Sequence, residues 1–311
     1  MNLYKAFGLI IETEEVLQEL LPVPEYEGKA EAYKGKAEVF IRKGKLPERM
    51  EDLIVDTPNV KIGRASYYSD IKNIAEFYVE KGSVIIYEPH ERASFETIKL
   101  YLLGSCMGAV LLQRRILPLH GSCLNIKGEG VLITGDSGAG KSTIAAALCK
   151  KGFRMLTDDV AAIVYQESRR PLVCPGYPSQ KLWEDAIDRM DIRGEKLCLN
   201  RSSNELNKYS VGSLAYYEDN PLLLTRIIEI IPSEEEALRM EEVKGAHKLE
   251  VILRNTYRKP IIDAMGLREW YFRQCLLIAE QAGVYRILRP HNKHLEQDIA
   301  GLITVKIAGG D

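Results

Sequence analysis

The chain has 311 residues, of which 46% are hydrophobic and 28% are charged, and its formal net charge is −2. This length suits two compact domains, and the composition is that of an ordinary soluble globular protein. Because basic and acidic residues nearly balance, the sequence gives no general attraction to nucleic acid or to an anionic membrane, and we predict neither partner.

The six cysteines are scattered and form no CxxC pair, which favours reduced thiols in a cytosolic setting. The first residues include acidic side chains where a signal peptide needs an apolar core. The most apolar stretch, 101–112, has about 12 residues, against the roughly 20 that a membrane-spanning helix needs. We therefore predict a cytoplasmic protein.

Residues 1–92 have a mixed, short-ranged pattern. Three segments read as strands, at 37–41, 75–79 and 83–87, with turn-prone Pro and Gly residues between them. We predict a small strand-rich N-terminal domain over 1–92, in which no constellation of residues suggests chemistry. Residues 93–311 then form a second, catalytic domain.

The second domain begins with helical spacing of apolar residues from about Ser94 to Arg114. Two apolar runs, 122–126 and 131–134, are separated by Lys-Gly-Glu-Gly, which predicts a hairpin. A helix is expected over 142–151, and it stops at Gly152.

Further strands and helices alternate beyond this helix. Strands are predicted at 153–156, 160–165, 222–231 and 284–288, helices at 246–257, 262–282 and after Pro290, and a loop at 171–183. Such alternation indicates an α/β fold.

The segment that follows the hairpin fits the pattern GxxxxGK[ST] in full. It consists of Gly135, Asp136, Ser137, Gly138, Ala139, Gly140, Lys141 and Ser142. Glycines allow the backbone N–H groups to approach phosphate oxygens, and the following helix directs its positive end at them. Lys141 can reach the β- and γ-phosphates, while the Ser142 hydroxyl can bind Mg²⁺.

A chance glycine-rich turn is the alternative for this loop. An apolar strand before it and an Ala-rich helix after it are the context that a nucleotide-binding loop requires, so we favour ATP binding. We include Thr143, the next residue, among the candidate nucleotide contacts.

Asp158 and Asp159 follow a short apolar strand, 17 residues after Lys141. One helix and one strand fit this interval and bring the pair back beside the loop, where a carboxylate can approach Mg²⁺. A solvated acidic turn is the alternative. Two adjacent carboxylates also suggest divided roles, one for the metal and one for the proton of an incoming hydroxyl.

Other residues carry less information. His120 precedes the hairpin, and a lone histidine is usually structural; His291 and His294 are interpreted as surface residues. The chain has no NKxD motif, no LSGGQ-like stretch and no HRD or DFG motif. A GTPase, a transporter ATPase and a eukaryotic-type protein kinase are therefore disfavoured.

The order of these motifs over 117–163 resembles the core of the HPr kinase/phosphorylase family. In that family a His-Gly precedes a hairpin, the hairpin enters a GxSGxGKS loop, and a helix and strand end in Asp-Asp. The stretches 101–122, 175–183 and 253–258 are similar to a divergent branch of HPr-kinase-related proteins, which are encoded with ribosomally made peptides such as lasso peptides.

The resemblance implies a P-loop kinase core of the HPr kinase type that uses ATP and Mg²⁺. By position, Lys141 resembles the phosphate lysine and Ser142 the metal hydroxyl. Asp158 resembles the general base, Asp159 its companion at the metal, and His120 the histidine beside the transferred phosphate. The related kinases are hexamers, so a homo-oligomer is expected by analogy.

The chain also departs from the family. Thr143 stands where the family usually has Glu, and neither a Glu-Ile-Arg-Gly signature nor a PxRPGR-like stretch is present. Lys181, Lys208 and Arg254 are candidates for the missing positive charge. These departures favour a precursor peptide as the acceptor of the phosphoryl group. The alternatives are a serine kinase of HPr or another carrier, a small-molecule kinase, and a non-catalytic nucleotide sensor.

Overall fold

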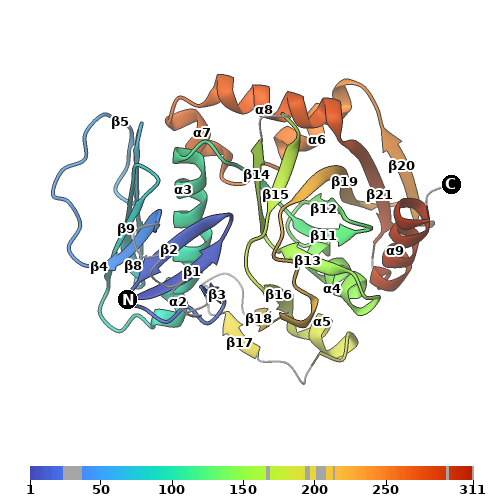
Figure 1. Ribbon diagram of the computed structural model, residues 1–311, viewed down its shortest axis with the longest axis horizontal. Helices are drawn as coiled ribbons and strands as arrows, with labels where there is room; N and C mark the ends of the chain where they lie inside the picture. Colours follow the sequence, from blue (N-terminus) through green and yellow to red (C-terminus); the bar gives the residue numbers. More distant parts are fainter. Residues whose placement is uncertain are drawn as a thin grey trace. The chain divides into compact units, whose positions relative to one another are not determined.

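The computed structural model describes residues 1–23, 37–165, 169–192, 197–200, 208–212, 214–291 and 294–309. The chain divides into two compact units (Figure 1). The first is built mainly from Met1–Pro118 and Tyr257–Tyr271, and the second from Leu119–Leu199, Asn207–Thr256 and Phe272–Asp311. This division differs from the predicted boundary between residues 92 and 93.

The boundary differs because the helix that we expected to open the second domain is attached to the first unit. Gly82 N–H donates to Gln113 Oε1 at 2.6 Å, and Arg114 Nη1 donates to the Gly82 carbonyl at 3.1 Å. Arg114 also pairs with Glu38 at 2.6 Å. These bonds fasten the end of the helix to a turn of the N-terminal sheet.

The first unit contains a nine-stranded sheet with the strand order β3-β1-β2-β4-β9-β8-β7-β6-β5. Residues of β2 and β9 alternate between buried and more exposed positions, as in a sheet with one covered face, whereas Phe77, Tyr78 and Val79 in β8 are all buried. The strands are β1 Asn2–Ala6, β2 Leu9–Thr13, β3 Leu21–Pro22, β4 Val39–Lys43, β5 Leu53–Asp56, β6 Val60–Gly63, β7 Ser66–Ile71, β8 Ala75–Glu80 and β9 Val84–Pro89.

A continuous helical run packs on β8 in this unit. It consists of α2 (Phe95–Tyr101), the π-helical turn η1 (Leu102–Cys106) and α3 (Met107–Gln113). The run is 19 residues long, so by length and composition it could cross a bilayer. It is longer than the apolar stretch 101–112, from which we had predicted that no segment is long enough to span a membrane. However, 72% of its most apolar window is buried within the protein, as in a core helix of a soluble domain. The short α7 (Lys259–Ala264) also belongs to this unit.

The second unit is built on a mixed sheet that also has nine strands, with the path β10-β14-β15-β19-β12-β11-β13 and with β20 and β21 off this path. At its centre β12 and β19 run parallel, with Thr134 beside Glu229, and β21 pairs with the other edge of β19. The strands are β10 Leu117–His120, β11 Ser122–Ile126, β12 Glu129–Gly135, β13 Arg154–Thr157, β14 Val160–Tyr165, β15 Pro171–Cys174, β19 Leu222–Ser233, β20 Arg239–Val243 and β21 Gly283–Pro290.

A smaller three-stranded sheet, ordered β16-β18-β17, belongs to the same unit. Its strands are β16 Ser179–Trp183, β17 Leu197–Asn200 and β18 Lys208–Gly212. The remaining helices are α4 Lys141–Lys150, α5 Glu184–Arg189, η2 Leu214–Tyr216, α6 Ala246–Arg254, α8 Arg268–Gln281, α9 Glu296–Ile303 and η3 Thr304–Ala308.

The core of the second unit joins α4 to the sheet and to α9. Ile133 of β12, Leu148 of α4, Ile228 of β19 and Ile303 of α9 are all fully buried in it. Each such side chain contributes roughly 1.5–3 kcal/mol by leaving water. This packing fixes the start of α4, and with it the loop from β12, against the central strands.

Two predicted elements were wrong. Residues 171–183, expected to form a loop, contain β15 and β16, and β15 joins β14 to β19 in the large sheet. Its proline stands at the first residue of the strand, where proline is tolerated. The helix expected over 262–282 is two helices, α7 and α8, separated at Gly266, which has a positive φ of 70°.

Candidate active site

The glycine loop connects β12 to α4, and its ends require glycine. Gly135 has φ 136°, and a Cβ there would lie 2.4 Å from the Ile230 carbonyl oxygen of β19. Gly140 is the N-cap of α4 with φ 93°. Any larger residue would push the loop away from the sheet or strain its backbone. The loop therefore lies close against β19, with the N–H groups at the start of α4 directed at its concave side.

Lys141 is buried at the start of α4. Its Nζ donates to the carbonyl oxygens of Gly135 and Asp136, each at 3.0 Å. The ammonium group is thus folded over its own loop and held by neutral acceptors.

Asp158 follows β13 and is 5% exposed. Its Oδ1 accepts the Ser142 hydroxyl at 3.0 Å and the Ser122 hydroxyl at 2.5 Å, while its Oδ2 accepts the Lys181 backbone N–H at 3.0 Å. The carboxylate predicted from sequence therefore contacts the hydroxyl predicted to bind the metal. All three donors are neutral groups.

Asp159 is more accessible and has different partners. It adopts a left-handed backbone conformation with φ 72°, which turns its side chain away from that of Asp158. Its Oδ2 accepts the Lys181 ammonium at 2.9 Å, and its Oδ1 lies 3.5 Å from His120 Nδ1. The side chain keeps 25% of its surface exposed.

His120 is positioned at the end of β10 from two sides. Its backbone N–H donates to the Asn255 carbonyl at 2.8 Å, and its own carbonyl accepts the Thr134 hydroxyl at 2.6 Å. The ring Nδ1 lies 2.9 Å from the Asp159 carbonyl oxygen. Because a carbonyl can only accept, Nδ1 carries the proton and Nε2 is the basic nitrogen of the neutral ring.

The electrostatics of His120 favour this neutral form. Burial lowers the pKa of His120 and outweighs the neighbouring Asp159 carboxylate, which raises it, while the Lys141 ammonium lowers it further. At neutral pH the site therefore contains a neutral imidazole beside the Asp159 carboxylate.

A second buried carboxylate, that of Glu229, is linked to the phosphate loop through Asn255. Glu229 of β19 is 1% exposed and pairs with Arg254 and with Arg286, the latter at 3.1 Å. Asn255 links this pair to the loop, because its Nδ2 donates to Glu229 Oε1 at 3.0 Å and its Oδ1 accepts Gly135 N–H at 3.1 Å.

The three candidates for additional positive charge fall in different places. Lys181 of β16 lies in the site and touches both aspartates. Arg254 pairs with Glu229, and the Lys208 side chain lies outside the described residues. Sequence reasoning missed Ser122 and Asn255. The His-Gly-Ser order could have indicated Ser122, but no local pattern marks Asn255.

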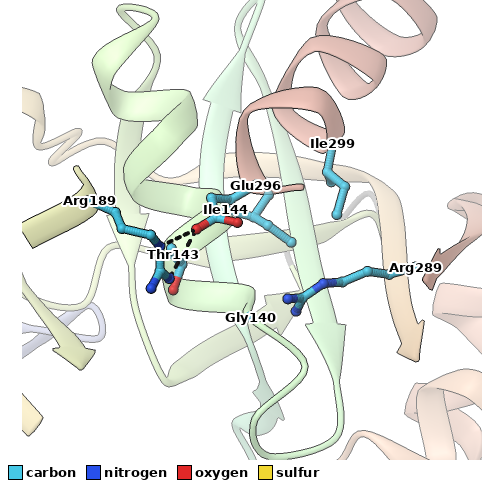
Figure 2. A pocket seen from close by; sticks show the side chains of 7 residues that line it. All are labelled: Gly140, Thr143, Ile144, Arg189, Arg289, Glu296 and Ile299. Atoms are coloured by element: carbon cyan, nitrogen blue, oxygen red, sulfur yellow. Dashed lines mark hydrogen bonds and ion pairs between the residues drawn. The ribbon is translucent and has the colours of Figure 1, made fainter. Parts of the chain in front are cut away.

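A pocket opens beside the first turn of α4 (Figure 2). It is lined by Gly140, Thr143, Ile144, Arg189, Arg289, Glu296 and Ile299. Arg189 and Arg289 approach the turn from opposite sides, and Arg289 Nη1 donates to the Ala139 carbonyl of the glycine loop at 3.0 Å.

Comparison with known proteins shows what the segment around this site is similar to. Residues 113–194 match the family model of the HPr Serine kinase C-terminal domain. The matched segment contains His120, the glycine loop, both aspartates and Lys181.

Individual relatives are named HPr kinase/phosphorylase. The chain is 49% identical over 72 residues to an HPr kinase/phosphorylase of Latilactobacillus sakei, covering 23% of this chain and 22% of that protein. It is 51% identical over 55 residues to one of Pediococcus pentosaceus, covering 18% and 17%. The matched part is thus about a fifth of the length of these relatives.

A solved structure described as the Hpr(Ser) kinase/phosphatase from Coxiella burnetii is also similar. The alignment has 18% identity and a TM-score of 0.32, and it covers 60% of this chain and 87% of that one. Because the match to the family model covers residues 113–194, which contain the candidate site, the expected resemblance to HPr kinases is confirmed for that segment.

Proposed function

We propose that this protein is a Mg·ATP-dependent kinase that transfers the γ-phosphoryl group to a serine hydroxyl. The observation that carries the proposal is the 3.0 Å contact between Ser142 Oγ and Asp158 Oδ1, with the Lys141 ammonium on the adjoining loop and the Asp159–Lys181–His120 group next to it. The similarity of residues 113–194 to HPr serine kinases supports the same reaction.

The residues present fit ATP and Mg²⁺. The loop lies tightly on β19 at Gly135, and its backbone N–H groups and Lys141 would hold the phosphates. The hydroxyl–carboxylate pair of Ser142 and Asp158 consists of hard oxygen donors of the kind that Mg²⁺ prefers. When bound, the metal neutralises charge on the phosphate oxygens.

The contacts favour an exchange of the roles that the sequence assigned to the two aspartates. Asp158 was expected to accept the hydroxyl proton, yet it is 5% exposed and already accepts three hydrogen bonds, one of them from Ser142. Asp159 is more exposed and stands beside His120. We therefore assign Asp158 to the metal and Asp159 to the proton.

The transfer step then follows. The serine hydroxyl gives its proton to the Asp159 carboxylate while its oxygen forms a bond to the γ-phosphorus. The bond from that phosphorus to the β–γ bridging oxygen breaks, and ADP leaves with the electron pair. The Lys181 ammonium, at 2.9 Å from Asp159, holds this carboxylate in place. Positioning and charge stabilisation supply most of the rate.

We further propose that the acceptor serine belongs to a precursor peptide rather than to HPr. The proposal rests on the similarity of 101–122, 175–183 and 253–258 to kinases encoded with lasso peptides, and on the missing HPr kinase signatures. Homo-oligomer formation and a cytoplasmic location stay predictions.

The experiment incubates the protein with Mg·ATP and either HPr or a precursor peptide encoded beside its gene, and measures added phosphate mass. Phosphorylation of the peptide alone supports the full proposal, whereas phosphorylation of HPr alone would overturn the acceptor. Nucleotide binding without transfer to either acceptor would favour a sensor.

Two variants separate the aspartate roles. Asp158→Asn should raise the Mg²⁺ concentration needed for half-maximal rate, whereas Asp159→Asn should lower the maximal rate and leave that concentration unchanged. The reverse pattern would restore the sequence-based assignment.

A further inference from the structure

Three side chains of metal-binding types meet in the first unit, outside the segment that forms the candidate active site. Asp70 lies in β7, Glu76 lies in β8, and His90 is the first residue after β9. Each offers one ligand atom, a carboxylate oxygen or an imidazole nitrogen, and these three atoms all lie within 4.8 Å of one another. None of the three residues has a part in the transfer step described above.

Strand pairing brings these side chains together. Asp70 and Glu76 are directly opposite each other in the antiparallel β7–β8 pair, so their side chains are on the same face of the sheet. The His90 backbone N–H donates to the Ile74 carbonyl at 3.0 Å, one residue beyond the last pair of β8 and β9. In this position His90 Nε2 lies 2.9 Å from Asp70 Oδ1. The ligand atoms are therefore held by three neighbouring strands, although 20 residues separate Asp70 from His90.

Negative charge accumulates around the three side chains. Glu76 is also opposite Glu88 across the β8–β9 pair, so three carboxylates form a row across β7, β8 and β9. Like charges that are directly opposite each other destabilise a sheet. In the part of the chain that the structure describes, no lysine or arginine forms an ion pair with Asp70 or Glu76. A bound cation would offset this repulsion.

The nearby Tyr68 responds to the same negative charge. Tyr68 lies in β7 two residues before Asp70, and therefore on the same face of the sheet. Burial raises the pKa of Tyr68, and the Glu76 and Asp70 carboxylates raise it further. Lys61 of β6 has its Nζ 5.6 Å from the centre of the Tyr68 ring, but it pairs with Asp56 and not with these two carboxylates.

We propose that Asp70, Glu76 and His90 bind one Zn²⁺ ion, with water in the fourth position. Zn²⁺ binds imidazole nitrogen and carboxylate oxygen at about 2.0–2.2 Å in a tetrahedral arrangement, which separates the ligand atoms by about 3.4 Å. The separation is 2.9 Å for His90 and Asp70 and no more than 4.8 Å for the others, so rotation of the side chains can complete the site.

Binding requires a change of tautomer at His90. Because a carboxylate can only accept, Nε2 carries the proton in the contact with Asp70. On binding, the ion takes the lone pair of Nε2, and the neutral ring keeps its proton on Nδ1. The side chains of His90 and Asp70 retain 35% and 28% of their surface exposed, so an ion and a water molecule can reach them from solvent.

The mixed donor set selects among divalent cations. Imidazole nitrogen suits Zn²⁺, whereas Mg²⁺ prefers oxygen ligands in near-ideal octahedral geometry. The ligands come together only when β7, β8 and β9 are paired, so a bound ion stabilises the folded first unit over the unfolded chain.

The first test titrates Zn²⁺ into the full chain by calorimetry, in excess Mg²⁺ that occupies the metal position proposed for the kinase. We expect one Zn²⁺ site, whose affinity falls at least about tenfold in His90→Gln, because a ligand matters at least as much as the groups behind it. His247→Gln is the matched control, since His247 of α6 also lies beside a carboxylate, that of Glu250 at 3.3 Å. Its affinity should be unchanged. Absence of Zn²⁺ binding, equal binding in His90→Gln, or Mg²⁺ binding as tight as that of Zn²⁺ would overturn the proposal.

Thermal unfolding of Glu76→Gln gives a second test that does not depend on the histidine. In a chelator this variant should unfold at the same temperature as the unmodified protein or at a higher one, because Asp70 loses a like-charged neighbour. In Zn²⁺ the order should reverse, because the unmodified protein gains more from the bound ion. A lower unfolding temperature of the variant under both conditions would indicate a structural contact only and would contradict the zinc site. Neither test uses ATP, so failure of the kinase proposal would leave their outcome unchanged.

Discussion

Two buried carboxylates lie on either side of the phosphate loop, and they are satisfied in opposite ways. Glu229 pairs with two guanidinium groups and with the Asn255 amide. Asp158, nearly as buried, accepts two hydroxyls and one backbone N–H. The first carboxylate has its charge balanced within the protein, whereas the contacts of the second come from neutral donors.

The difference supports a structural role for Glu229 and the metal-binding role that we propose for Asp158. Burying an unbalanced carboxylate costs several kcal/mol, so it is sustained where a bound cation can balance it. Glu229 needs no ligand and serves as a fixed support behind the loop. Asp158 has the arrangement expected of a metal-binding acid, whose charge is neutralised when the nucleotide and metal enter.

The largest expected effect would test this division directly. Asp158→Asn removes the charge that we propose binds the metal, so at an Mg²⁺ concentration that half-saturates the unmodified protein the rate of phosphoryl transfer should fall at least about 100-fold. Glu229→Gln should lower it by less than about tenfold, because Glu229 touches no reacting group. Single-turnover kinetics at saturating nucleotide measure both rates. Similar losses in the two variants would abolish the distinction between the two acids.

For the free energy of unfolding we expect the opposite order, with the larger loss in Glu229→Gln and the smaller loss in Asp158→Asn. Glu229→Gln leaves Arg254 and Arg286 without their carboxylate, which should lower the free energy of unfolding by about 2–3 kcal/mol, since both guanidinium groups retain some solvent contact. Asp158→Asn should cost less than about 1 kcal/mol, because an amide can replace part of its hydrogen bonds. Urea unfolding followed by circular dichroism provides the measurement.

Asn255 connects Glu229 to the phosphate loop and should have an intermediate effect. Asn255→Ala removes the acceptor of Gly135 N–H and a donor to Glu229, so the loop loses its support. We expect nucleotide affinity to fall about tenfold, which corresponds to the loss of one hydrogen bond in a positioned site. Thr304→Ala, which removes a hydroxyl bond to the Ala300 carbonyl at the C-terminal end of α9, is the control. An unchanged nucleotide affinity in Asn255→Ala would show that Glu229 does not support the phosphate loop through Asn255.

The smallest expected effect concerns pH. Burial lowers the pKa of His120 below the ordinary 6.5, so below that pH the unfolded chain takes up a proton that the folded site resists. The free energy of unfolding should therefore decrease as the pH falls below 6.5 toward the lowered pKa, and above 6.5 this contribution is absent. In His120→Asn this part of the acid sensitivity should disappear, as urea titrations from about pH 5 to 8 would reveal. A parallel dependence in both proteins would contradict it.

Much of the second unit could be predicted because its signals are local. The strand–loop–helix around Lys141 is determined by glycine positions and apolar periodicity, and the hairpin by the turn at Gly128. The strands β15 and β16 were missed because Pro and Gly indicate turns locally, while strand pairing with β14, β19 and β18 overrides that preference.

The site residues were predictable as a group but their contacts were not. Nothing near Asp158 or Asp159 in sequence indicates which one meets Ser142, because this depends on the left-handed turn at Asp159. Lys181, Asn255 and Arg289 lie 22 to 150 residues from the groups they contact, so only the folded sheet brings them to the loop.

The position of Lys141 has a consequence for which phosphate compounds the loop could bind. Its ammonium already bonds to two carbonyls of its own loop, so under the proposed function a nucleotide would have to replace these bonds when it enters. A terminal phosphate would offset the loss of these two bonds with a charge-assisted hydrogen bond to Lys141. A monophosphate that cannot reach Lys141 would leave the ammonium bonded to the two carbonyls. Under the proposed function, the loop would therefore select phosphate chains by their length, because only a chain that reaches Lys141 can replace its bonds to the two carbonyls.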